Sequence, residues 1–163
     1  MKSFCSQCLI TLFLLIPHNL LATEIIFEYE TKNQVNVQDL IATIHEADIV
    51  LLSVPSKSMD HVCSELARVI AEQTALLSTT KGIHSDGFKL MSQVISERLP
   101  DHPVGVLSGP NLAQEVAERH LTASVVASQS PIVRKLTRNA FATKYFRLYS
   151  SEDLISVELG GAL

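Results

Sequence analysis

Apolar residues follow two patterns along this chain, and the two patterns alternate. Short continuous runs rich in valine, isoleucine and leucine predict strands that are buried on both faces of a sheet. Stretches in which apolar residues recur every three or four positions predict helices with one buried face. The strands are expected at 48–54, 74–78, 104–107, 121–127 and 145–149, with a weaker one at 24–30. The helices are expected at 37–47, 58–71, 86–98, 112–119, 130–141 and from 154 onward.

This alternation predicts an α/β fold in which a mainly parallel sheet is flanked by helices. The stretch 76–117 is its centre, because it holds strand, loop, helix, strand and loop in that order. Parallel strands place both loops at one edge of the sheet, and open α/β sheets bind ligands at that edge. One loop carries Lys81 and Gly82, and the other reads Ser-Gly-Pro-Asn over 108–111.

These two loops suit an anionic or polar ligand. Lys81 can act as a fixed cation for a phosphate or a carbonyl oxygen, with a surface lysine in a turn as the equal alternative. Gly109 allows close approach to the backbone, and the following helix start offers free N–H groups; an ordinary strand-to-helix turn is again the equal alternative. The six histidines show no metal-ligand spacing, so no metal site is predicted.

Composition narrows the class of protein. The chain has 163 residues, is 47% hydrophobic and carries a net charge of −4. These values fit one ordered domain and argue against a nucleic-acid binder, which normally carries a basic stripe. The loose basic group near the end is interpreted as a solvated helix face in preference to a phosphate-binding patch. It consists of Arg134, Lys135, Arg138, Lys144 and Arg147.

The cysteines give neither a disulfide framework nor a redox motif. Cys5 and Cys8 have C-x-x-C spacing, but no second pair follows and the motif does not open a helix within a βαβ unit. Cys63 falls on the apolar face of the helix at 58–71 and is predicted to be a buried, inert thiol.

Residues 1–23 do not match the remainder, so the chain divides into this apolar N-terminus and a domain at 24–163. The basic start, the apolar run at 8–16 and a small residue at Ala22 resemble a secretory signal, and the run is too short for a stable membrane span. An aberrant start of a shortened gene is the competing interpretation. The protein is expected in the cytoplasm, or outside it if 1–22 acts as a signal.

Four motifs together resemble one family. They are Asp-Ile-Val-Leu-Leu-Ser-Val-Pro-Ser at 48–56, Ser-Thr-Thr-Lys-Gly-Ile at 78–83, Val-Leu-Ser-Gly-Pro-Asn-Leu-Ala at 106–113 with Glu-Val-Ala at 115–117, and Val-Glu-Leu-Gly-Gly-Ala-Leu at 157–163. In this order and spacing they look like the bacterial type of NAD(P)-dependent glycerol-3-phosphate dehydrogenase. The family interconverts sn-glycerol 3-phosphate and dihydroxyacetone phosphate, with NAD or NADP as cofactor, for glycerophospholipid synthesis.

The resemblance implies roles for four residues. Lys81 would contact both substrate and cofactor, Gly109 and Asn111 would line the substrate site, and Ala113 would touch the cofactor. A cation beside the substrate oxygen would stabilise the negative charge that develops during hydride transfer. The substrate would be a triose phosphate, and no nucleic-acid partner is implied.

The chain also departs from the family pattern. No glycine occurs before Gly82, so the glycine-rich loop that opens a Rossmann-like domain is missing. The family's proton-transferring lysine would follow Leu163, and the helical second domain is absent. The sequence therefore predicts an incomplete Rossmann-like domain that is inactive alone. A complementing chain from a split gene, a homodimer and an exported non-enzymatic protein are the alternatives.

Overall fold

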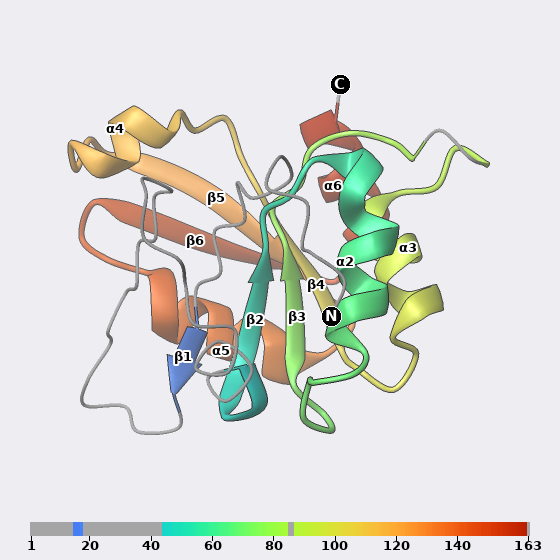
Figure 1. Ribbon diagram of the computed structural model, residues 1–163. Helices are drawn as coiled ribbons and strands as arrows, with labels where there is room; N and C mark the ends of the chain where they lie inside the picture. The colour runs from blue at the N-terminus through green and yellow to red at the C-terminus, as the bar shows by residue number, and fades with distance from the viewer. Residues whose placement is uncertain (1–14, 18–43, 85–86, 163) are drawn as a thin grey trace, which may run out of the picture.

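The computed structural model describes residues 15–17, 44–84 and 87–162. The expected strand at 24–30, most of the expected helix at 37–47 and most of the signal-like segment lie outside the described residues. The described part forms one twisted sheet with helices on both faces (Figure 1). The predicted α/β class is thereby confirmed.

The sheet has six strands, and their spatial order equals their order in the chain. They are β1 (Leu15–Pro17), β2 (Ala47–Leu52), β3 (Ala75–Ser78), β4 (Val104–Ser108), β5 (Thr122–Ala127) and β6 (Phe146–Ser151). The pairs β2–β3, β3–β4 and β5–β6 are parallel, whereas β1–β2 and β4–β5 are antiparallel. The sheet is therefore mainly parallel, as predicted.

Four of the five described α-helices, with one short 3₁₀ helix, lie between the described strands, and the fifth follows the last strand. They are η1 (Ser56–Ser58), α2 (Met59–Leu66), α3 (Met91–Arg98), α4 (Ala113–Ala117), α5 (Pro131–Phe141) and α6 (Leu154–Ala162). Pro131 begins α5, as a proline in the first helical position should. The carboxylate of Asp153 accepts a hydrogen bond from the Ser156 amide at 3.0 Å and caps α6. Hydrogen bonding from the Ser156 side chain, and then from its amide, lowers the pKa of Asp153.

Alternate residues of the central strands feed two cores. Leu76 of β3 and Val50 of β2 pack with α2 and α3 on one face, whereas Leu77 and Ile49 pack on the other face, which α5 covers. Helix α6 lies on the same face as α3, because the two helices are joined by hydrogen bonds between Ser92 and Glu158.

The antiparallel placement of β5 differs from an all-parallel reading of the pattern. The sequence predicts a helix of eight residues at 112–119, whereas α4 has only five residues. The five residues of α4 rise about 7.5 Å, less than half the length of a strand of about 16 Å, so α4 by itself does not carry the chain back to the start of β4. The chain therefore enters β5 near the point where β4 ends and runs back in the opposite direction.

Strand β1 was not predicted. Leu15–Pro17 pairs antiparallel with β2 at the edge of the described sheet, with Leu15 opposite Val50 and Pro17 opposite Ala47. A proline is tolerated there because an edge strand leaves some N–H positions without a ladder bond.

Cys63 is buried in the core beside α3, as predicted, with no exposed surface. Burial, and then the negative charge of Asp60, raises the pKa of Cys63 to about 11, and the Arg98 cation offsets part of this rise. The folded state therefore favours the neutral thiol. The corresponding stabilisation is complete below pH 9 and is lost as the pH rises through 11.

We expect Cys63 to resist alkylation in the folded chain. At pH 8, a pKa of about 11 instead of 9.0 lowers the thiolate fraction roughly 100-fold. With Cys5 and Cys8 changed to serine, iodoacetamide labelling followed by mass spectrometry should be at least 100-fold slower in buffer than in 8 M urea. Equal rates in buffer and in urea would contradict the buried position.

Candidate functional site

The two loops that the sequence singles out lie at one edge of the sheet. Strands β3 and β4 are parallel neighbours, with Leu77 opposite Gly105 and Ser78 opposite Val106. Helix α3 connects them, so the chain forms the predicted βαβ unit. The loop after Ser78 and the loop after Ser108 consequently leave the sheet on the same side.

Two threonines attach the first loop to the end of β2. The Thr79 amide donates to the Leu52 carbonyl at 2.9 Å. The Thr80 hydroxyl donates to the Val54 carbonyl at 2.7 Å and accepts from the Val54 amide at 3.1 Å. These bonds fix the backbone immediately before Lys81, because they cross between two strands.

The backbone after Lys81 is fixed as well. Gly82 has a φ of +120°, a conformation that favours glycine. The next residue, Ile83, makes an isolated bridge with Leu90, and the His84 ring lies 3.0 Å from the Asp60 carboxylate. Asp60 also accepts a hydrogen bond from Arg98 at 2.8 Å. The lysine therefore sits in a loop that is tied to the sheet on one side and to α2 and α3 on the other.

The Lys81 side chain is exposed at this edge. Beside it lies a small hollow of about 10 Å³, room for roughly one water molecule. The hollow is bounded by the two loops and by α6. Its lining residues are Ser78, Thr79, Thr80, Lys81, Val106, Leu107, Ser108, Glu158 and Gly161.

The structure thus brings the two predicted loops together, and it adds α6 as a third wall.

Gly109 and Asn111 lie in the second loop but turn toward β5. A Cβ on Gly109 would stand 2.6 Å from the Ser124 hydroxyl and 2.8 Å from the Ala123 carbonyl, so this position has room only for glycine. The Asn111 amide donates to the same carbonyl at 3.0 Å and also to the Ser124 hydroxyl. Neither residue lines the hollow, and both shape the loop that flanks it.

Ala113 is the first residue of α4, directly after this loop. The sequence reasoning did not single out Thr80 or Glu158, although both border the hollow. Thr80 could have been found from its place beside Lys81 at a strand end. Glu158 gave no local signal, because its partner is 66 residues away.

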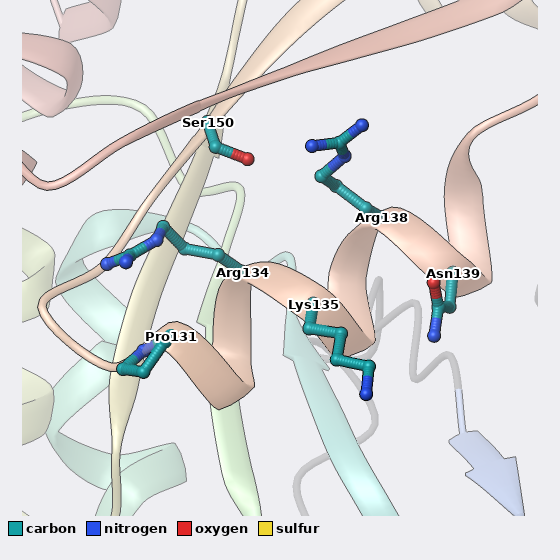
Figure 2. A pocket seen from close by; sticks show the side chains of 6 residues that line it. All are labelled: Pro131, Arg134, Lys135, Arg138, Asn139 and Ser150. Carbon is teal, nitrogen blue, oxygen red and sulfur yellow. The ribbon is translucent and has the colours of Figure 1, made fainter.

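A second hollow, of about 480 Å³, lies along α5 and contains part of the predicted basic group. Figure 2 shows Arg134 and Arg138 on the side of α5 that faces Ser150, whereas Lys135 and Asn139 point away from it. The Arg134 guanidinium pairs with Glu152 at 2.9 Å and also donates to the Ser128 carbonyl. The cations therefore do not converge on one point, which favours the solvated-face interpretation.

The described residues contain neither a metal cluster nor a membrane-spanning helix. No group of three histidine, cysteine or acidic side chains gathers there as a metal ion would require. Within the same ranges, no helix has the length and apolar character needed to cross a bilayer.

A mainly parallel sheet flanked by helices, with the loops of a βαβ unit gathered at one edge, is the architecture of Rossmann-like domains. The family model for the N-terminus of NAD-dependent glycerol-3-phosphate dehydrogenase matches residues 23–133. The chain belongs to this family.

Relatives and solved structures agree on the family. Glycerol-3-phosphate dehydrogenase [NAD(P)+] of Saccharophagus degradans is 47% identical over 131 residues, which cover 80% of this chain and 37% of the relative. The Teredinibacter turnerae protein of the same name is 46% identical over 77% of this chain and 37% of its own length. The crystal structure of glycerol-3-phosphate dehydrogenase from Coxiella burnetii superposes with a TM-score of 0.70 and 33% identity, over 76% of this chain and 38% of that one.

The chain therefore spans less than two-fifths of the length of these relatives. The family binds a dinucleotide cofactor, and the residues present fit only part of one. No glycine precedes Gly82 in the 163 residues, so residues 1–81 cannot supply the glycine turn that approaches a pyrophosphate in Rossmann-like domains. The described residues fit a polar or anionic group at Lys81 better than they fit a whole dinucleotide.

Proposed function

We propose that this chain carries part of the site at which sn-glycerol 3-phosphate and dihydroxyacetone phosphate are interconverted with NAD or NADP. The single observation behind the proposal is the exposed Lys81 in its fixed loop, beside Ser108 and at the ligand-binding edge of the sheet. The names of the relatives supply the reaction. Supply of glycerol 3-phosphate for glycerophospholipids is the proposed role in the cell.

Lys81 is the group to which we assign the chemistry in this chain. Its ammonium group can bind a phosphate or carbonyl oxygen of the substrate and stabilise negative charge on it. The bonds of Thr79 and Thr80 to β2 hold the loop before substrate arrives, so little ordering is needed on binding. We further propose Gly109 and Asn111 as residues that shape the substrate loop, and Ala113 as a neighbour of the cofactor.

Turnover by these 163 residues alone is not expected. The glycine turn for a pyrophosphate is missing from residues 1–81, and the matched region is about 37% of the relatives' length. The remaining parts of the active site would come from further polypeptide, such as a complementing chain. We propose the cytoplasm as the location, where a free thiol such as Cys63 stays reduced.

The proposal predicts phosphate-dependent binding that requires Lys81. Dihydroxyacetone phosphate should shift the amide resonances of residues 79–82 in ¹⁵N-labelled chain, whereas dihydroxyacetone without phosphate should not. The variant Lys81→Met should weaken binding roughly 10- to 150-fold, because a hydrogen bond to a charged group contributes about 1.5–3 kcal/mol.

The matched control is Lys135→Met. Lys135 is an exposed lysine on α5, on the far face of the sheet from α3, and its loss should leave the affinity unchanged. An equal loss in both variants would mean that general positive charge, and not Lys81, attracts the phosphate. Shifts confined to α5 would contradict the proposed site.

A further inference from the structure

Glu158 is a buried carboxylate in an otherwise largely exposed helix. It is 5% exposed, and it is the one residue of α6 that is buried in the described structure. Placing a carboxylate out of water is costly unless hydrogen bonds satisfy its oxygens. The Glu158 carboxylate oxygens therefore need hydrogen-bond donors inside the protein.

Both donors belong to Ser92, near the beginning of α3. The Ser92 amide donates to one carboxylate oxygen of Glu158 at 3.0 Å, and the Ser92 hydroxyl donates to the other. The amide belongs to the first turn of α3, where N–H groups have no acceptor within their own helix. The residue just before α3, Leu90, has no side-chain oxygen that could accept this hydrogen bond. The acceptor therefore comes from Glu158, 66 residues away from Ser92.

The arrangement is also favourable electrostatically. The N-terminus of a helix carries partial positive charge, and a carboxylate placed there is stabilised. Glu158 therefore acts as a cap for α3 that belongs to another helix. The bond links the position of α6 to the position of α3.

One turn further along α6, the helix meets the end of β4. A Cβ on Gly161 would overlap the Ser108 hydroxyl, so the Ser108 side chain packs directly against the α6 backbone at Gly161. Glu158 and Gly161 are three residues apart and share one helix face. Both line the hollow next to Lys81. Figure 1 shows the end of α6 at the edge toward which β2 and β3 point.

We infer that Glu158 is a positioning residue, which clamps α6 to the first turn of α3 and thereby holds Gly161 against Ser108 as the third wall of the site. The clamp itself stands on the hydrogen bonds just described. Its effect on ligand affinity rests on the function proposed above.

Amide hydrogen exchange of the free chain tests the clamp. In Glu158→Ala, exchange of the Ser92 amide and of the α6 amides should rise at least 10-fold, while the α5 amides keep their protection. In Glu158→Gln one acceptor oxygen remains, so the rise should be smaller. The control Glu118→Gln changes an exposed glutamate on the far side of the glycine loop and should leave all three regions unchanged.

If Glu158→Ala does not fold, Ser92→Ala decides in its place. That variant keeps the hydrogen bond from the residue 92 amide to Glu158 and loses only the one from the hydroxyl. Amide exchange in α6 is therefore expected to rise at least 3-fold. Unchanged α6 exchange in the folded variant would overturn the inference, even if the Ser92 amide alone became faster.

Affinity for dihydroxyacetone phosphate supplies a readout that general stability would not change. Folded Glu158→Ala should bind at least 5-fold more weakly than the parent chain, with Glu158→Gln between the two. An unchanged affinity would overturn the positioning role. If the parent chain binds no dihydroxyacetone phosphate, the proposed function fails, whereas the exchange experiment still decides the clamp.

Discussion

Replacing Leu76 with alanine is expected to lower the free energy of unfolding by about 2–5 kcal/mol. Leu76 lies in the middle of β3 and has no exposed surface. It packs in the core between the sheet and the α2–α3 layer. Alanine would remove three carbon atoms there and leave a cavity that the rigid central strand cannot close.

The measurement is urea unfolding followed by circular dichroism, for the parent chain and the variant in parallel. Leu121→Ala is the matched control, because Leu121 is 79% exposed and its truncation should change stability by no more than about 0.5 kcal/mol. Typical domains have only about 5–15 kcal/mol in total, so Leu76→Ala is expected to remove a large share of the stability. A loss below 1 kcal/mol would mean that the centre of the sheet is not tightly packed.

The strands of the parallel half could be predicted from the sequence because both of their faces are covered. Residues 49–52 form a continuous apolar run within the predicted strand 48–54, and the structure places β2 at Ala47–Leu52 with alternate side chains in two cores. The direction of β5 could not be predicted in the same way. It depends on the real length of α4, and element ends are the least certain part of any sequence-based assignment.

Some residues of the candidate site could likewise be predicted from the sequence, and others could not. Lys81 and Ser108 follow strands directly, so the βαβ pattern alone predicts that they meet at one edge, and they do. The orientation of Asn111 toward Ala123 and the arrival of Glu158 at Ser92 depend on tertiary packing. No local pattern encodes either contact.

Replacing Gly109 with alanine is also expected to lower the free energy of unfolding substantially. Its substitution by alanine would place a Cβ 2.8 Å from the Ala123 carbonyl and 2.9 Å from the Asn111 amide nitrogen. Backbone atoms of a paired strand cannot move aside cheaply, so we expect a loss of about 1–3 kcal/mol in the free energy of unfolding. The hydrogen bonds of Asn111 to Ala123 and Ser124 should be displaced together with the loop.

Gly160→Ala is the matched control, because a Cβ at Gly160 meets no atom within 4 Å. Alanine also favours a helix over glycine, so this variant should be at least as stable as the parent. Thermal melts of both variants, together with titration of dihydroxyacetone phosphate under conditions where each is folded, separate two roles for Gly109. If Gly109 serves only packing, folded Gly109→Ala should bind as the parent does. If the loop that it shapes also contacts the ligand, as we expect, affinity should fall in the folded variant too, because a displaced loop would shift the neighbouring Ser108, which lines the hollow beside Lys81.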